Sequence, residues 1–266
     1  MIPNHRSTKN APAAGRKIGF GWLPDLPDHR DKYYDEIRKK PARLPRRVDL
    51  RPLCSAVKYQ RHLQSCTSHA ISAALEFLEK KDHVHFEDLS RLFIYYNERL
   101  LTKKTNIDSG ARLRDGIKSL REYGVCPEKL WPYVISRFRQ KPPPRCYREA
   151  RKHRITSYHR IMAVDEMNVC LAEGYPFVCG ISVYQSFLSR KVAHTGHIDL
   201  PKKHDRVIGG HAVLVVGYDE SAKSFLLRNS AGHDWGQGGY FTVPYKYLEN
   251  RRYSWDFWTI RRVENL

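Results

Sequence analysis

The stretch Gln60-Arg-His-Leu-Gln-Ser65-Cys66-Thr-Ser-His-Ala70 places a cysteine where a long helix is predicted to begin. From Cys66 to Lys81 the chain has no glycine or proline, and apolar side chains recur at helical spacing. Ser65 is a suitable N-cap residue, and two lysines end the segment. The sequence therefore predicts a helix over residues 66–81, with Cys66 in its first turn.

A cysteine in the first turn of a helix is predisposed to ionise, because the unpaired N–H groups and the positive end of the helix dipole stabilise a thiolate. The thiolate is the nucleophilic form of the side chain. The alternative is a small buried thiol that packs like alanine, which is the commoner role of a lone cysteine. Nucleophilic catalysis at Cys66 therefore requires a base elsewhere in the chain.

His211 is the candidate base among the 13 histidines of the chain. It follows two glycines and opens an apolar run, 212–216, which predicts a buried strand. A turn and a second predicted strand follow, and the second strand ends at Asn229. An asparagine beside a histidine can accept the imidazole N–H and hold the ring for a nucleophile. The alternative is a strand-end histidine with a solvent partner.

The register of this hairpin decides whether the two side chains meet. If the hairpin closes at Tyr218 and Ser224, Asn229 falls opposite Val213, and Asn229 and His211 become diagonal neighbours on one face of the sheet. A slip of one residue would separate them.

Cysteine, histidine and asparagine in this order, with the last two roughly 145 and 163 residues after the first, form the papain-like arrangement. From about Leu44 to the C-terminus the chain resembles the papain-like cysteine peptidases, and its motifs most resemble those of their prokaryote-type branch. The resemblance is carried, in chain order, by Gly21-Trp22, Val48-Asp49-Leu50-Arg51, Val57-Lys58-Tyr59-Gln60, Ser65-Cys66, Leu92-Phe-Ile-Tyr-Tyr-Asn-Glu-Arg99, Arg114-Asp115-Gly116, Trp131-Pro132-Tyr133, His211-Ala-Val, Val216-Gly217-Tyr218, Arg228-Asn229-Ser230 and Trp235-Gly236.

The resemblance implies a role for each matching residue. Cys66 would attack the peptide carbonyl, His211 would pair with it as an imidazolium and act as acid and base, and Asn229 would orient His211. The Gln60 side chain and the Cys66 backbone N–H would form the oxyanion hole. No metal or organic cofactor is implied. Substrate contacts are expected at Ser109, Gly110, Gly210 and Trp235.

Four residues depart from the family pattern. Leu63 replaces a half-cystine, and Gln64 replaces a glycine beside the oxyanion hole. Thr67 follows the nucleophile, as in the prokaryote-type branch. Ala231 stands where the family has a tryptophan that shields the histidine–asparagine hydrogen bond, although Trp235 is retained. These departures bear on turnover and specificity and leave the nucleophile and base in place.

The chain is strongly basic, with a net charge of +19. Residues 137–160 hold nine lysines or arginines and one acid, Glu149. The simpler interpretation of this segment is a solvated, extended basic loop; the alternative is a contact with an anionic partner. No nucleic-acid-binding motif accompanies it. The spacing of His194 and His197 lacks further ligands, so we expect no metal site.

The six cysteines argue against a dense disulfide framework, because five remain if Cys66 is free. Cys126 and Cys146 are a possible bridge. The start of the chain lacks a secretory signal and no apolar run is long enough to span a bilayer, so an intracellular location is slightly favoured. We expect a monomer.

The order of the elements predicts an α+β fold of the papain-like type with two lobes. A helical lobe over about 45–150, with helices at 66–81, 87–101 and 111–123, would carry the nucleophile. A β lobe over about 151–266, with strands at 155–163, 176–184, 211–218, 224–229, 239–243 and 256–262, would carry the base, and a polypeptide substrate would lie in the cleft between them. Residues 1–17 would be disordered, and 18–44 would be a proline-containing arm that lies along the body or inhibits it.

The predicted function is that of a cysteine-type peptidase, an endopeptidase, which acts through a thioester on Cys66. Two alternatives stay open. One is a catalytically weak papain-like protein that binds an anionic partner through its basic surface, and the other is a transpeptidase or ligase on the same scaffold.

Overall fold

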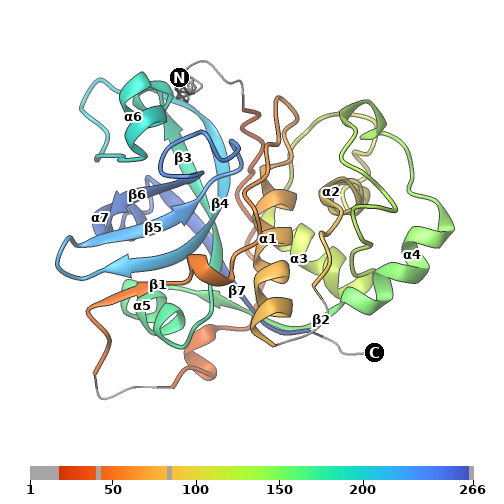
Figure 1. Ribbon diagram of the computed structural model, residues 1–266, viewed down its shortest axis with the longest axis horizontal. Coiled ribbons are helices and arrows are strands. Elements are labelled where there is room, and N and C mark those ends of the chain that lie inside the picture. Colours follow the sequence, from red (N-terminus) through yellow and green to blue (C-terminus); the bar gives the residue numbers. More distant parts are fainter. Residues whose placement is uncertain (1–17, 40–42, 83–85, 264–266) are drawn as a thin grey trace, which may run out of the picture.

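The computed structural model describes residues 18–39, 43–82 and 86–263 and has a layer of helices packed against one sheet (Figure 1). The predicted disordered tail, 1–17, lies outside the described residues. No helix within the described ranges is long and apolar enough to cross a membrane.

The helical layer lies to the right of the sheet in Figure 1 and consists of α1 (Cys66–Lys81), α2 (Arg91–Leu100), α3 (Leu113–Glu122) and α4 (Pro144–Ala150). Nearly every side chain of α1 is buried, because α2 and α3 cover one side of this helix and strands β4 and β7 cover the other. The first residue of α1 therefore lies at the junction of the helical layer and the sheet.

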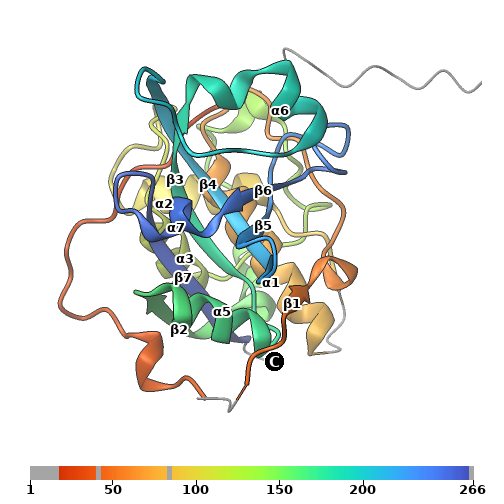
Figure 2. The same ribbon diagram turned by 90° about the vertical axis from the view of Figure 1, so that its left-hand side faces the viewer.

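The sheet is antiparallel, with strand order β2-β7-β3-β4-β5-β6, and β1 pairs with β4 off this path. Its strands are β1 (Arg47–Asp49), β2 (Ile155–Ile161), β3 (Phe177–Tyr184), β4 (Val207–Asp219), β5 (Ser224–Arg228), β6 (Tyr240–Pro244) and β7 (Ser254–Val263). Helices α5 (Val164–Ala172), α6 (Arg190–Thr195) and α7 (Tyr245–Glu249) lie on the side of the sheet away from α1, as Figures 1 and 2 show.

Both faces of the sheet are buried, which explains the continuous apolar run of β4. Leu214 and Val216 belong to the hydrophobic core shared with the helical layer, whereas Val213 and Val215 belong to a second core on the other face. A strand covered on both faces reads as an unbroken apolar segment because its side chains alternate between two cores.

The α+β fold is confirmed, and the predicted helix 66–81 has the observed ends. The division at 150 is wrong for β1, which lies in the N-terminal half and pairs with β4. The interpretation of 137–160 as an extended loop is also wrong, because α4 begins at Pro144 within it. A proline at the first helical position starts a helix readily, so the run Pro142-Pro-Pro144 ends in a helix.

Candidate active site

Cys66 is the first residue of α1, and its side chain is fully buried. The backbone N–H groups of Ala212, Gly21 and Thr67 act to lower the pKa of its thiol, so Ala212, the residue after His211, faces the sulfur. Ser65 occupies the N-cap position, but its hydroxyl makes no cap hydrogen bond and lies 2.6 Å from the Tyr133 hydroxyl. The predicted serine cap is therefore wrong, because the Ser65 hydroxyl is hydrogen-bonded to Tyr133, which is distant in the sequence.

His211 lies within β4 and Asn229 directly follows β5, and a hydrogen bond joins their side chains. His211 Nε2 lies 2.9 Å from Asn229 Oδ1, and the backbone N–H of Ser230 donates to the same oxygen at 2.8 Å. This second donor fixes the orientation of the amide. The Nδ1 atom of the ring is left as the nitrogen available to a thiol.

The hairpin reaches this arrangement in a different register from the predicted one. It closes at Asp219 and Ser224, and a β-bulge between Val215 and Gly217 then shifts the pairing by one residue. Beyond the bulge the register is the predicted one. The prediction of two neighbouring side chains is confirmed by the hydrogen bond, although the predicted closing pair is wrong.

The buried side chain of Gln60 is oriented at both ends of its amide. Its Oε1 accepts a hydrogen bond from the Ser230 hydroxyl, and its Nε2 donates to the backbone carbonyls of Leu63 and Gly19, both at 2.8 Å. Gly19 belongs to the N-terminal arm. A carbonyl of the arm thus occupies the donor that the sequence assigned to the oxyanion hole.

The start of the arm, residues 18–23, runs in extended form past the nucleophile. Trp22 donates its backbone N–H to the Gly210 carbonyl at 3.0 Å, and the Leu23 N–H donates to the Ala111 carbonyl at 3.0 Å. Ala111 in turn donates to the Gly21 carbonyl at 2.9 Å. The arm therefore pairs with Ala111 on one side and with Gly210 on the other at the same time.

Glycines on both sides permit this close approach. A Cβ atom on Gly21 would lie 2.1 Å from the Gln64 carbonyl oxygen, and one on Gly180 would lie 1.9 Å from the Trp22 ring. The Trp22 indole is almost completely buried and stacks on Trp255 with ring centroids 5.9 Å apart. The fit of the arm depends on the absence of side chains at these positions.

Burial under the arm sets the charge of the nucleophile and the base. It raises the pKa of the Cys66 thiol to about 11, against lowering contributions from nearby backbone N–H groups. It also lowers the pKa of His211 to about 4, and the Asn229 hydrogen bond offsets only part of this effect. Burial therefore favours the neutral form of each side chain while the arm is docked, and the thiolate–imidazolium pair stays a prediction.

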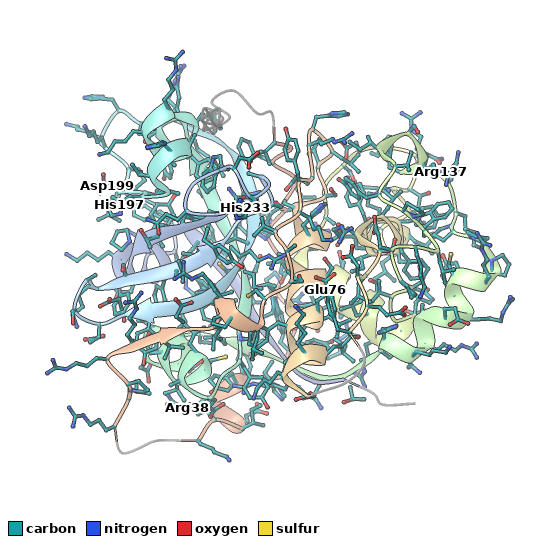
Figure 3. All side chains as sticks on the ribbon, in the orientation of Figure 1. Arg38, Glu76, Arg137, His197, Asp199 and His233 are labelled. Atoms are coloured by element: carbon teal, nitrogen blue, oxygen red, sulfur yellow. The ribbon has the colours of Figure 1, made fainter. Side chains whose placement is uncertain are left out.

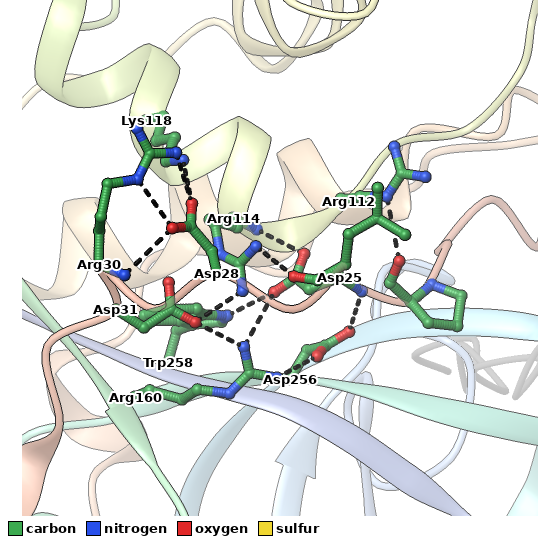
Figure 4. Close-up of polar contacts among 12 residues, drawn as sticks. Asp25, Asp28, Arg30, Asp31, Arg112, Arg114, Lys118, Arg160, Asp256 and Trp258 are labelled. Atoms are coloured by element: carbon green, nitrogen blue, oxygen red, sulfur yellow. Dashed lines mark hydrogen bonds and ion pairs between the residues drawn. The ribbon is translucent and has the colours of Figure 1, made fainter.

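Beyond the cleft, a network of buried ion pairs anchors the arm to both layers (Figure 4). Asp31 binds Arg114 of α3 at 2.6 Å and Arg160 of β2 at 3.0 Å. Asp25 accepts from the Trp258 indole N–H at 2.8 Å, and its backbone N–H donates to Asp256 at 2.8 Å. The arm thus joins α3 to strands β2 and β7.

The four residues expected to contact substrate lie at two places. Ser109, Gly110 and Gly210 lie along the arm, and a Cβ on Gly110 would meet the Gly21 carbonyl at 2.0 Å. Trp235 is buried and stacks on Phe187 at 5.4 Å. Sequence reasoning missed Phe187, whose ring lies edge-on to His211 at 6.3 Å and to Phe20 of the arm at 6.2 Å. Only its apolar character in a short segment after β3 could have marked it.

The possible metal site at His194 and His197 is not assembled. His197 hydrogen-bonds to Asp199 and Thr242 near α6, where Figure 3 places His197 and Asp199 side by side. Among the residues that the structure describes, no three His, Cys, Asp or Glu side chains are grouped to hold a metal ion. The six cysteines, all within the described ranges, are free thiols, including Cys126 and Cys146.

The fold and the site are those of a papain-type cysteine peptidase, and comparison with known proteins agrees. Residues 44–251 match the family described as papain family cysteine protease. An uncharacterized peptidase C1-like protein of Acanthamoeba polyphaga mimivirus is 38% identical over 92% of this chain and 87% of its own length.

Among solved structures, xylellain, a cysteine protease from Xylella fastidiosa, is 43% identical with a TM-score of 0.87 over 94% of this chain and 98% of its own. Bromelain from Ananas comosus, solved with the inhibitor E64, shares the fold at 21% identity and a TM-score of 0.60, covering 76% of this chain and 90% of its own. The chain belongs to the papain family of cysteine proteases, and its substrates are polypeptides. The predicted resemblance to the prokaryote-type branch agrees with the similarity to xylellain.

Proposed function

We propose that Cys66, His211, Asn229 and Gln60 carry out peptide hydrolysis in this protease. The observation that carries the proposal is the oriented His211–Asn229 pair, in which His211 directly precedes Ala212, whose backbone N–H acts on the pKa of the Cys66 thiol. In this position the free Nδ1 of His211 can exchange a proton with the thiol. Gln60, held by Ser230, presents a donor to a carbonyl oxygen.

The reaction follows from these positions. The Cys66 thiolate attacks the peptide carbonyl carbon, and the oxyanion accepts hydrogen bonds from Gln60 Nε2 and the Cys66 N–H. The C–N bond breaks as the His211 imidazolium gives its proton to the leaving amine, which leaves a thioester. His211 then takes a proton from water, which attacks the thioester and releases the carboxylic acid and the Cys66 thiolate.

Labelling with an epoxide-type cysteine-peptidase probe tests the assignment. A single adduct on Cys66, located by intact mass and peptide mapping, is expected in a full-length chain whose arm has been loosened by Trp22→Ala. Cys66→Ala should abolish the adduct. Cys54→Ala is the matched control, since Cys54 is the one cysteine of the six that is not buried, and it should leave labelling unchanged. Labelling that persists in Cys66→Ala would contradict the proposal.

We also propose that the arm, residues 18–44, inhibits the enzyme. The support is that Gly19 occupies the Gln60 donor and that the arm pairs with both Ala111 and Gly210. A substrate carbonyl cannot reach the donor while the arm is docked. Opening the arm by Trp22→Ala is expected to accelerate alkylation of Cys66.

A third proposal is an acidic polypeptide partner for the 137–160 segment. There, a hollow of about 550 Å³ is lined by three prolines, Tyr147 and the cations Lys141, Arg148 and Arg151. These three cations are exposed, whereas the neighbouring Lys152 is paired with Glu149 at 2.7 Å. The helix α4 that carries Arg148 lies at the edge of the helical layer away from the sheet (Figure 1).

Replacing Lys141, Arg148 and Arg151 by glutamine should raise KM for a glutamate-rich peptide and flatten its dependence on salt. Lys152→Gln, which changes a charge that is already paired, is the matched control. An unchanged salt dependence in the triple variant would leave this segment as solvated surface.

A further inference from the structure

A small cavity lies behind the His211–Asn229 pair, between α1 and strands β4 and β5. Its volume is about 10 Å³, which is space for one water molecule. His69 of α1 and Asn229 both line it, with Ala70, Ala73 and Ala212 among the apolar neighbours. His69 Nε2 and Asn229 Nδ2 are buried and have no hydrogen-bond partner among the described residues.

The two unpartnered atoms have opposite hydrogen-bonding character. His69 Nδ1 lies 2.9 Å from the Ser65 carbonyl oxygen, which can only accept, so Nδ1 carries the hydrogen and Nε2 is an acceptor. Burial, then the nearby Arg91, lowers the pKa of His69 to about 3, which keeps the ring neutral. Asn229 Oδ1 already accepts from His211 and Ser230, so its Nδ2 is the donor.

We propose that this cavity binds one water molecule that donates to His69 Nε2 and accepts from Asn229 Nδ2, and that His69 is thereby a positioning residue for Asn229. The functional part rests on the proposed role of Asn229. The water completes the hydrogen bonds of the amide and opposes its rotation, which would turn Nδ2 toward His211. A rotated amide would present a donor to the ring N–H and lose the orientation that catalysis needs.

His69 also connects this water to the opposite side of the site. Its ring meets the Tyr133 ring edge-on with centroids 4.9 Å apart, and the Tyr133 hydroxyl donates to the Gln60 backbone carbonyl at 2.9 Å. The same histidine is therefore linked through Tyr133 to Gln60 and, through the proposed water, to Asn229.

Two variants separate hydrogen bonding from packing. His69→Phe keeps an aromatic ring but loses the acceptor, whereas His69→Gln keeps a side-chain acceptor and loses the ring. The structure predicts electron density for a water between residue 69 and Asn229 in crystals of the full-length wild type and of His69→Gln, and none in His69→Phe. This readout requires no activity, so it is independent of the proposed catalytic roles.

Turnover of a peptide by the full-length chain, in the wild-type and Trp22→Ala backgrounds, gives the functional readout. His69→Phe is expected to lower kcat about tenfold with KM unchanged, the low end of what loss of an orienting partner costs, and His69→Gln should remain close to wild type. If His69 acted through packing alone, His69→Phe would keep a kcat close to that of wild type and His69→Gln would lower it. A dry cavity in the wild type, or a His69→Phe variant with the kcat of its parent, would overturn the proposal; loss of activity in Cys66→Ala tests the catalytic assignment separately.

Discussion

Replacing Trp22 by alanine should release the arm from the active site. The indole is 5% exposed when the arm is docked, and it lies over Gly180 and Gly210 and against Trp255. It is the largest side chain that the arm inserts between the two layers. In the released arm the same ring would be in water, so the whole cost of truncation falls on the docked state.

The size of the effect follows from the burial of the ring. Truncating a buried tryptophan to alanine costs about 3–5 kcal/mol. Because each 1.4 kcal/mol is about tenfold in an equilibrium constant, the fraction of chains with an open arm should rise about 100-fold or more, until most chains are open. The ion-pair anchor at Asp25 and Asp31 is untouched, so the arm remains attached beyond the cleft.

The rate of Cys66 alkylation by iodoacetamide near pH 6 measures this opening. In the docked state the thiol is buried with a pKa of about 11 and reacts only through rare openings. Leu26→Ala is the matched control, because this arm side chain is 61% exposed and its loss should change nothing. An unchanged alkylation rate in Trp22→Ala, with thermal unfolding that proves the variant folded, would refute the argument.

Three further predictions concern the arm and the site that it covers. In the Trp22→Ala background, His211→Ala should reduce the alkylation rate of Cys66 near pH 6 to that of an ordinary thiol, and equal rates with and without His211 would exclude an ion pair. Burial, and then the neighbouring Asp256, raises the pKa of Asp25 to about 6 from its usual 3.8, so the folded state binds the extra proton and the stability that Asp25 contributes is lost as pH rises from 3.8 through about 6. Asp25→Asn should remove this pH dependence from the free energy of unfolding, and a variant with the wild-type slope would contradict it. Gly21→Ala should also open the arm, since its Cβ would lie 2.1 Å from the Gln64 carbonyl oxygen, and a rate equal to that of wild type would show that the contact relaxes at no cost.

The parts of this site that follow from local signals were predictable from the sequence. The start of α1 at Cys66 follows from a run without helix breakers, and His211 stands out because it opens a buried strand after two glycines. The sequence predicted that His211 and Asn229 are neighbours, but it did not predict the register of the hairpin that brings them together. The β-bulge that sets its register lies at Gly217, which packs closely against β1: a Cβ atom added there would lie 2.2 Å from the Val48 carbonyl oxygen. The sequence of the hairpin alone does not reveal this contact with β1.

What the sequence could not predict depends on contacts between distant segments. The Ser65 hydroxyl is taken by Tyr133, 68 residues away, and the charge of Cys66 is set by an arm that begins more than 40 residues upstream. A helix dipole favours a thiolate, but the cost of burying a charge is larger when the site is closed. The local argument therefore describes the intrinsic tendency of the cysteine, and the tertiary contact decides its state.

The complementarity between the arm and the body makes the arm a built part of the fold. Gly21 of the arm lies against the loop that carries Gln64, and Gly180 and Gly210 of the sheet lie against Trp22 of the arm. Each side thus lacks a side chain where the other has bulk, and the two glycines of the sheet come more than 150 residues after Trp22 in the chain. The same arm supplies acids to Arg114 and Arg160, which hold the helical layer and the sheet together. The anchor at Asp25 and Asp31 and the segment that covers Cys66, residues 18–23, are different parts of the arm. Residues 18–23 can therefore leave the active site while the anchor still joins the two layers.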